Sequence, residues 1–270
     1  MTRIIYYYQT FTSLKPLLLK NTVVTHIHLS SIHFGKNPDN TPYIHLNDHP
    51  PNDKIFNNMW NDIKNANNLG IKIILMVGGA GGAFQTLFSD FETYYDLLKK
   101  TINDNKCING IDLDIEEPVS IDYIKKLMNR IKADFGKDFI ITMAPVAYAL
   151  QSDTTGMGGF CYKDLYKSKE GLLIDYFNVQ FYYDFSVESY NKVIDNGYPE
   201  NKIVLGATSD MDVTNMQNIV KQLYSKYGMN FGGVFDWEYF NAGNDKKNPY
   251  KWALDMKNSM LDYNNYCKIL

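Results

Sequence analysis

Short runs of apolar and β-branched residues recur along the chain, and stretches with apolar residues at helical spacing lie between them. The runs predict eight β-strands, at residues 4–8, 23–31, 72–77, 110–115, 139–144, 176–182, 203–207 and 233–237. Three apolar stripes predict helices, and a last helix is expected over residues 250–260. The stripes are Ile55, Met59, Ile63 and Ala66, then Ile121, Ile124, Leu127, Met128 and Ile131 behind Ser120 as N-cap, then Met216, Ile219, Val220 and Leu223.

The alternation of strands and helices predicts an α/β fold with parallel strands, because each strand must return through a crossover before the next begins. An open doubly wound sheet alternates in the same way, but eight units in 270 residues favour a closed (β/α)8 TIM barrel. Since no linker, repeat or low-complexity segment divides the chain, residues 1–270 are predicted to form a single domain. Residues 35–51, rich in Asn, Asp and Pro, are predicted to form a long loop after the second strand.

The chemistry of the chain is concentrated in one of these strands. Asp112, Asp114 and Glu116 alternate with apolar residues, and residues two apart on a strand share a face about 6.5–7 Å from each other. Strands of a parallel barrel are normally apolar on both faces, so a buried row of acids is unusual and costly. Crowding and burial raise the pKa of at least one such carboxyl, which gives a proton donor near neutral pH. Glu116 lies at the end of the strand and is best placed to reach a ligand.

Other interpretations of the acidic row are a metal site, an exposed edge strand and a structural buried network. The row lacks the ligand spacing and central Gly of a calcium loop. The residues that alternate with the acids, Ile111, Leu113 and Ile115, are apolar and indicate that the strand is buried. Catalysis is therefore favoured over all three of these interpretations.

The sequence Asn-Gly-Ile-Asp-Leu-Asp-Ile-Glu at residues 109–116 resembles the Asp-Gly-x-Asp-x-Asp-x-Glu motif of glycoside hydrolase family 18, the chitinases. Four other segments resemble elements of that family in the same order along the chain. They are Met76-Val77-Gly78-Gly79, Thr142-Met143-Ala144-Pro145, Gln180-Phe181-Tyr182-Tyr183 and Val234-Phe235-Asp236-Trp237.

The resemblance implies a retaining, substrate-assisted mechanism in which the acetamido oxygen of the substrate is the nucleophile. Glu116 would protonate the glycosidic oxygen, Asp114 would hold the acetamido N–H, and Asp112 would share a proton with Asp114. Tyr182 would hydrogen-bond the acetamido oxygen, and Trp237 would form the floor beneath the sugar. Further substrate contacts are expected at Gln180, Met143, Gly79 and Tyr183. Tyr8, at the end of the first predicted strand, either lines the sugar cleft as a further substrate contact or belongs to the core.

Two positions depart from the family pattern. Asn109 stands where the family has its first Asp, and we expect retuned proton sharing rather than loss of activity. Tyr183 stands where Asp or Asn follows the sixth-strand Tyr, so a shifted register with Tyr183 and Asp184 is the alternative to Tyr182. Only residues 208–232 separate the last two predicted strands, so the additional α+β domain of many chitinases is expected to be absent. Without that domain, we expect a shallow, open cleft, which is suited to endo-action.

The resemblance leaves three functions to separate. The first is an endo-acting chitinase that binds chitin or N-acetylglucosamine oligosaccharides. The second is an endo-β-N-acetylglucosaminidase acting on the chitobiose core of N-glycans. The third is a non-catalytic chitin-binding lectin, which the presence of Glu116 disfavours.

Composition and smaller motifs argue against other partners. The net charge of −3 provides no concentrated basic patch for nucleic acid, and no apolar stretch has the length of a transmembrane helix. The glycines at 78–82 lack phosphate-loop spacing, and His26 and His28 lack a third ligand, so neither a cofactor nor a metal is expected. Three separated cysteines argue against a disulfide framework; they are Cys107, Cys161 and Cys267. We expect a monomer, cytoplasmic for want of a signal peptide, or secreted if a leader has been removed.

Overall fold

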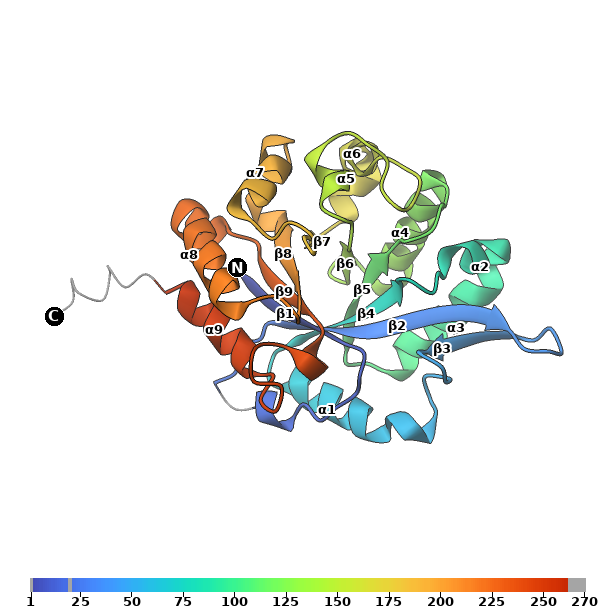
Figure 1. Cartoon of the computed structure of the whole chain (residues 1–270). Coiled ribbons are helices and arrows are strands. Elements are labelled where there is room, and N and C mark those ends of the chain that lie inside the picture. Colours follow the sequence, from blue (N-terminus) through green and yellow to red (C-terminus); the bar gives the residue numbers. More distant parts are fainter. Residues whose placement is uncertain (1, 19–20, 262–270) are drawn as a thin grey trace.

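The computed structural model describes residues 2–18 and 21–261. Eight parallel strands close into a barrel, because β1 pairs in parallel with both β2 and β9 (Figure 1). The predicted (β/α)8 TIM barrel is therefore confirmed. The strands are β1 (Arg3–Tyr8), β2 (His26–Lys36), β3 (Pro42–Leu46), β4 (Lys72–Gly78), β5 (Ile108–Asp114), β6 (Ile140–Met143), β7 (Tyr176–Gln180), β8 (Ile203–Thr208) and β9 (Gly233–Trp237).

Helices cover the outside of the barrel (Figure 1). They are α1 (Asn57–Asn68), α2 (Phe84–Ser89), α3 (Phe91–Asp104), α4 (Ile121–Phe135), α5 (Tyr148–Gln151), α6 (Tyr162–Lys167), α7 (Val187–Asp195), α8 (Val213–Tyr227) and α9 (Lys251–Ser259). Ser120 caps α4 as predicted, since its side chain accepts a hydrogen bond from the Asp122 amide. Between β8 and β9 the chain forms α8 and one 3-10 turn, so no additional domain is inserted there.

The segment predicted as a long loop after the second strand contains a β-hairpin instead. β2 continues to Lys36, and β3 runs antiparallel beside it. Ile44 and Leu46 of β3 are buried, and Phe34 of β2 packs edge-on against Tyr94 of α3. The Asn, Asp and Pro residues that suggested a loop belong to the turn and its flanks, and they mask the alternating pattern of β3.

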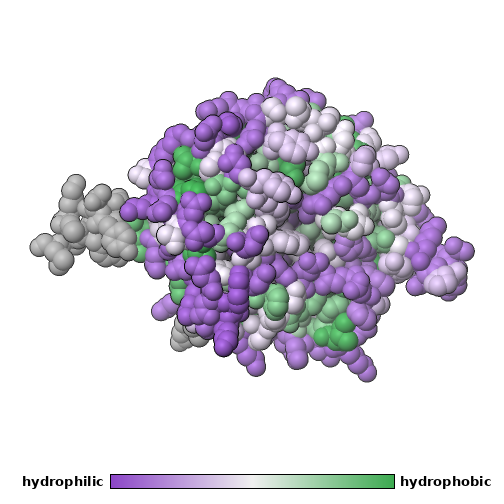
Figure 2. Space-filling model, in the orientation of Figure 1, coloured by the Kyte–Doolittle hydropathy of each residue, from purple (hydrophilic) through white to green (hydrophobic). Residues whose placement is uncertain are grey.

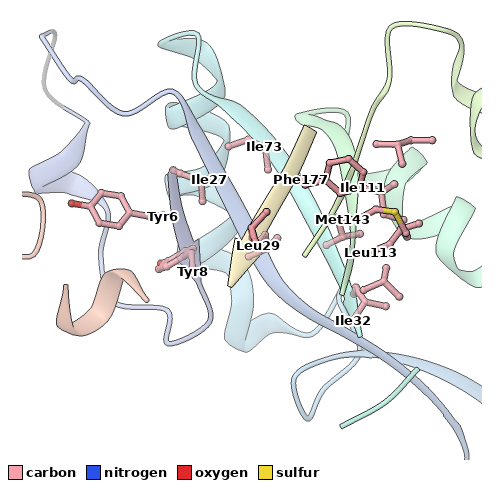
Figure 3. Close-up of a cluster of buried hydrophobic side chains, with 14 of the residues drawn as sticks. Tyr6, Tyr8, Ile27, Leu29, Ile32, Ile73, Ile111, Leu113, Met143 and Phe177 are labelled. Atoms are coloured by element: carbon pink, nitrogen blue, oxygen red, sulfur yellow. The ribbon is translucent and has the colours of Figure 1, made fainter. Parts of the chain in front are cut away.

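Alternate residues of each barrel strand face opposite sides of the wall. One set packs against the helices in the larger core, as Figure 3 shows for Ile27, Leu29, Ile73, Ile111 and Leu113 among others. The other set forms a second, smaller cluster within the barrel, made of Ile5, Tyr7, Met76, Tyr176, Val204 and Phe235. A difference of one residue in sequence therefore decides whether a side chain reaches the barrel interior or the helix layer.

Hydrophilic residues cover most of the face seen in Figure 2, and the hydrophobic residues on it lie in scattered groups. Among residues 2–18 and 21–261, the structure contains no helix with the length and apolar character to span a membrane. Cys107 and Cys161 are free thiols, and Cys267 lies outside the described residues.

Candidate active site

The three acids of the predicted row lie along and just beyond β5 and share its inner side. Asp112 is fully buried, Asp114 is 5% exposed, and Glu116 is half-buried beyond the end of the strand. Gln180, at the end of β7, bridges Asp114 and Glu116. Its Nε2 donates to Asp114 Oδ1 at 3.2 Å and to Glu116 Oε1 at 3.4 Å. The same nitrogen donates to the carbonyl oxygen of Ala144 at 2.8 Å, which fixes the amide between β5 and β6.

The Asp112 carboxylate is surrounded by donors from four other strands. The Tyr7 hydroxyl of β1 donates to Oδ2 at 2.7 Å, and the Thr142 hydroxyl of β6 donates to Oδ1 at 2.5 Å. Asn178 Nδ2 of β7 lies 3.3 Å from Oδ1, and His28 Nδ1 of β2 lies 3.3 Å from Oδ2. A buried carboxylate with several donors is stabilised in its ionised form.

The two aspartates have pKa values displaced in opposite directions. Burial acts to raise the pKa of Asp112, but the charge and hydrogen bond of His28 and the hydroxyls of Thr142 and Tyr7 hold it below its ordinary value. Burial raises the pKa of Asp114 well above its ordinary value, and the charges of Glu116 and Asp112 add to the effect. The surroundings therefore favour the negative charge on Asp112 and the proton on Asp114.

Gly79 lies next to Asp114 at the end of β4. Its amide donates to the backbone carbonyl of Asp114 at 2.9 Å, and its φ of +87° is accessible to glycine with little strain. A Cβ at this position would come within 3.5 Å of Asp114 Oδ2 and 3.0 Å of the Met76 methyl group. A larger residue at this position would therefore be strained in its backbone and would crowd Met76 beside the Asp114 carboxyl.

Aromatic side chains form the floor around the acids. Tyr7 packs against Trp237 at the end of β9, with ring centroids 5.2 Å apart. Tyr182 packs edge-on against Phe235, which places its ring on the interior side in the favoured register rather than the shifted one. Burial raises the pKa of Tyr182 well above its ordinary value, with contributions from Asp114, so its hydroxyl stays protonated and can donate.

An open cavity of about 430 Å³ begins at Glu116 and extends between the segments that follow β6 and β7. Gln180 and Tyr182 line its inner end. Tyr183, fully exposed, and Tyr148, half-exposed, line its outer part together with Met157. Flat aromatic surfaces with polar rims are suited to sugar rings.

Two of the predicted substrate contacts lie on the wrong side of the barrel wall. Met143 is fully buried and packs with Leu113 and Phe177 in the helix-facing core (Figure 3). Tyr8 is also fully buried there, and its hydroxyl donates to the Thr12 carbonyl at 2.6 Å. The prediction for Met143 is wrong, and of the two roles left open for Tyr8 the core role is the one found, because both residues have the outward parity of their strands.

Asn109, predicted to retune proton sharing among the acids, has its hydrogen-bond partners elsewhere, and its influence on activity stays a prediction. Asn109 is the extra residue at an irregularity between β4 and β5, where Ile73 pairs with Ile108 and Ile74 with Gly110. Its Oδ1 accepts from the Ile73 amide at 2.9 Å and from Asn67 Nδ2 at 2.8 Å. These contacts with β4 and with α1 place its side chain toward the helix layer and away from the three acids.

Sequence reasoning missed most of the groups that hold Asp112. Tyr7 and Asn178 were not singled out, and Thr142 was named only as part of a family-like segment, although each has the inward parity of its strand and a polar side chain. His28 was considered only as a metal ligand, and its Nε2 lies 3.2 Å from the Tyr176 hydroxyl in addition to the contact of Nδ1 with Asp112. Within the described ranges no group of three or more His, Cys, Asp or Glu side chains is arranged to hold a metal ion.

The family model described as Glycosyl hydrolases family 18 matches residues 3–270. Chitinase 2 of Rhizopus oligosporus is 26% identical over 216 residues, which are 68% of this chain and 37% of that protein, so this chain spans little more than a third of the relative's length. A fungal endo-β-N-acetylglucosaminidase of the same family has a TM-score of 0.87 and 34% identity, covering 96% of this chain and 98% of that one. Chitinase ChiC from Aspergillus fumigatus has a TM-score of 0.83 and 32% identity, covering 97% and 100%.

Proposed function

The chain belongs to glycosyl hydrolases family 18, and we propose that it is a retaining, endo-acting chitinase that hydrolyses β-1,4-linked N-acetylglucosamine polymers. The observation that carries this proposal is the unequal pair of buried aspartates behind Glu116. The four side chains around Asp112 favour its ionised form, and burial and the neighbouring charges favour the protonated form of Asp114. A half-buried glutamate at the rim of such a pair has the position that a general acid needs.

In the first step, Glu116 gives its proton to the glycosidic oxygen while the bond between that oxygen and C1 breaks. The acetamido carbonyl oxygen of the same sugar forms a new bond to C1, giving a cyclic oxazolinium ion. Asp114 accepts a hydrogen bond from the acetamido N–H, and the negative charge of Asp112 stabilises the developing positive charge. Tyr182 donates to the acetamido oxygen and orients it, and Trp237 supports the sugar ring.

In the second step, water loses a proton to the Glu116 carboxylate and attacks C1 from the side that the leaving group vacated. The oxazolinium ring opens, the acetamido group is restored, and Glu116 is protonated again. The configuration at C1 is retained because it is inverted twice. No carboxylate nucleophile is required, which agrees with the position of both aspartates behind the acid rather than opposite it.

The open cavity beside Glu116 supports cleavage within a chain. A sugar held by Asp114, Tyr182 and Trp237 leaves the far side of Glu116 for the departing part of the polymer. That side carries Tyr148 and Tyr183, and it is open to solvent. A long leaving chain can therefore extend out of the cavity, as endo-action requires.

A second candidate is endo-β-N-acetylglucosaminidase activity on N-glycan cores. It is favoured by the likeness to the fungal enzyme of that name, which has the higher TM-score and identity of the two similar structures described above. The chemistry at Glu116 would be identical, and the two activities differ in what lies beyond the cleaved bond.

The test is hydrolysis of chitin oligosaccharides and of a high-mannose glycopeptide by wild type, Glu116→Gln and Glu117→Gln. Loss of the general acid should lower the rate about 10²- to 10⁴-fold. Glu117 is the matched control, because its carboxylate faces away from the site and accepts from the Ala83 and Phe84 amides at the start of α2. We expect Glu117→Gln to lose stability but to keep its turnover.

Each outcome separates the candidates. Cleavage of chitin oligosaccharides alone supports the chitinase, and cleavage of the glycopeptide alone supports the second candidate. Binding of chitin without cleavage of either substrate would mean a lectin. A Glu116→Gln rate near that of wild type would show that the acid has been assigned to the wrong residue.

A further inference from the structure

Asp236, the residue before Trp237 on β9, is a buried carboxyl that the proposed mechanism does not use. It has the outward parity of its strand, and in register it lies between Tyr6 of β1 and Ala207 of β8. Its Oδ1 shares a hydrogen bond with the hydroxyl of Ser209, just beyond the end of β8. Its Oδ2 is buried and has no hydrogen-bond partner among the described residues. The carboxyl therefore acts on its surroundings through Ser209.

Ser209 holds the backbone that carries Trp237. Its amide donates to the Trp237 carbonyl at 3.0 Å, and its hydroxyl donates to the Glu238 carbonyl at 3.0 Å. The Glu238 carboxylate in turn accepts from the amides of Gln9 and Thr10, each at 2.8 Å. The segments that follow β1, β8 and β9 are thus joined at the residue after the tryptophan.

The number of protons between Asp236 and Ser209 decides whether all these bonds can form. The Ser209 hydroxyl has one proton, and a carbonyl oxygen can only accept. If the hydroxyl donates to Glu238, its contact with Asp236 Oδ1 is a hydrogen bond only when the carboxyl carries a proton and donates it. An ionised carboxylate would draw the hydroxyl proton to itself, because a hydrogen bond to a charged group is stronger, and the Glu238 carbonyl would lose its donor.

The surroundings of Asp236 favour the neutral form that this arrangement needs. Burial raises its pKa to about 8, although the hydrogen bond of Ser209 acts in the opposite direction. The other charged or titratable groups that interact with it are Lys246, which lowers the pKa, Glu238 and Asp210, which raise it, and the hydroxyls of Tyr6 and Tyr182. Below this pKa the carboxyl donates to Ser209, and above it the bond from Ser209 to Glu238 is lost.

We propose that Asp236 is a positioning residue for Trp237, because its proton turns the Ser209 hydroxyl toward Glu238 and so fixes the segment that carries the tryptophan. In the proposed function, on which this inference rests, Trp237 supports the sugar ring. Loss of the proton releases the Glu238 carbonyl and leaves the general acid, Glu116, in place. Substrate affinity, rather than the bond-breaking step, therefore depends on Asp236.

The first test measures binding apart from hydrolysis. A chitin oligosaccharide is titrated by calorimetry into Glu116→Gln, with and without Asp236→Asn, at pH values below and above 8. Asparagine donates at every pH and so replaces the neutral carboxyl. We expect the affinity of Glu116→Gln to fall about two- to tenfold above the pKa, and Asp236→Asn to remove this fall. A fall of equal size in both proteins, or none in Glu116→Gln, would overturn the proposal.

Two further variants in the Glu116→Gln background separate positioning from packing. Ser209→Ala removes the bond to Glu238, so at either pH it should bind as weakly as its parent does above 8, and undiminished affinity would contradict the proposal. Asp62→Asn is the matched control, because Asp62 is also buried outside the barrel and accepts from the Ser13 hydroxyl at 3.1 Å. It should lower the free energy of unfolding and keep the pH dependence of affinity. Loss of that dependence in Asp62→Asn would make the effect one of stability, not position.

A measurement without ligand separates failure of this role from failure of the proposed function. Of the three tryptophans, Trp60 and Trp252 are buried in the helix-facing core, and Trp237 lies at the barrel mouth. We expect the tryptophan fluorescence of wild type to change as the pH passes about 8, and Trp237→Phe and Asp236→Asn to lack this change. If no variant binds the oligosaccharide, the proposed function fails and the spectrum decides the role of Asp236. A flat spectrum in wild type, or a change that persists in Asp236→Asn, would overturn that role.

Discussion

Tyr7→Phe tests whether the donors around Asp112 set the charge of the aspartate pair. The substitution removes one hydrogen bond of 2.7 Å to a buried carboxylate and leaves the ring packed against His28, Phe235 and Trp237. A hydrogen bond to a charged group contributes about 1.5–3 kcal/mol. One pKa unit corresponds to about 1.4 kcal/mol, so the pKa of Asp112 should rise by about one to two units.

The consequence appears in the pH dependence of catalysis. As the pH falls, the pair takes up its second proton, and the negative charge that stabilises the oxazolinium ion is lost. Because the folded-state pKa of Asp112 is lowered in wild type, this loss occurs at acidic pH. In Tyr7→Phe the acid limb of kcat against pH should move upward by about one to two units. A fluorogenic chitobioside, assayed across the acidic range, measures the limb directly.

Tyr8→Phe is the matched control. Tyr8 is the next residue of β1, has equal burial, and loses one hydrogen bond of 2.6 Å, but it faces the helices. We expect a lower free energy of unfolding in both variants and a moved acid limb only in Tyr7→Phe. If the limb of Tyr7→Phe coincides with that of wild type, or if Tyr8→Phe moves it equally, the donors do not set the charge of Asp112.

Two further predictions concern stability. Burial raises the pKa of Asp236 from 3.8 to about 8, so the folded state holds a proton that the unfolded chain has released, and stability is lost as the pH rises through this interval. In wild type, the free energy of unfolding should therefore fall by at most about 6 kcal/mol as the pH rises between those values. Asp236→Asn should remove this fall, which urea titrations at several pH values measure. An unchanged dependence on pH in the variant contradicts the assignment. Asn109→Ala should cost about 1–3 kcal/mol because Ile73 N and Asn67 Nδ2 lose their acceptor, whereas Asn109→Asp should retain most of the stability. Neither Asn109 variant should move the pH limbs of kcat, and a moved limb would restore a link to the acids.

Most of the barrel could be predicted from the sequence because its strands are buried on both sides. Continuous apolar runs such as 72–77 therefore mark strands without reference to their neighbours. The β2–β3 hairpin was not predicted, because its strands are not buried on both sides. It lies at the edge of the barrel and needs only one buried side, so its pattern is Ile44 and Leu46 alternating with polar residues beside a turn rich in Asn and Asp.

The candidate site was predictable only as far as one strand could indicate it. The alternation of Asp112, Asp114 and Glu116 is visible within β5 alone. The partners of Asp112 come from other strands, and which residues lie level with it depends on the register between strands, which no single segment encodes. The same limit explains why two roles stayed open for Tyr8, because the inward parity of β1 is fixed by its pairing with β2 and β9.

The division of labour between the two aspartates cannot come from the motif, because both are the same residue two positions apart on one strand. It comes from their depth in the barrel. At the level of Asp112, four neighbouring strands present polar inward side chains that donate to its carboxylate. At the level of Asp114, a single side-chain donor, Gln180, is found within the described residues. The barrel therefore assigns the charge to the deeper acid and the proton to the one nearer the substrate. A relative that kept all three acids but lost these interior donors would be expected to lose the asymmetry, and with it the fixed anion that the proposed mechanism requires.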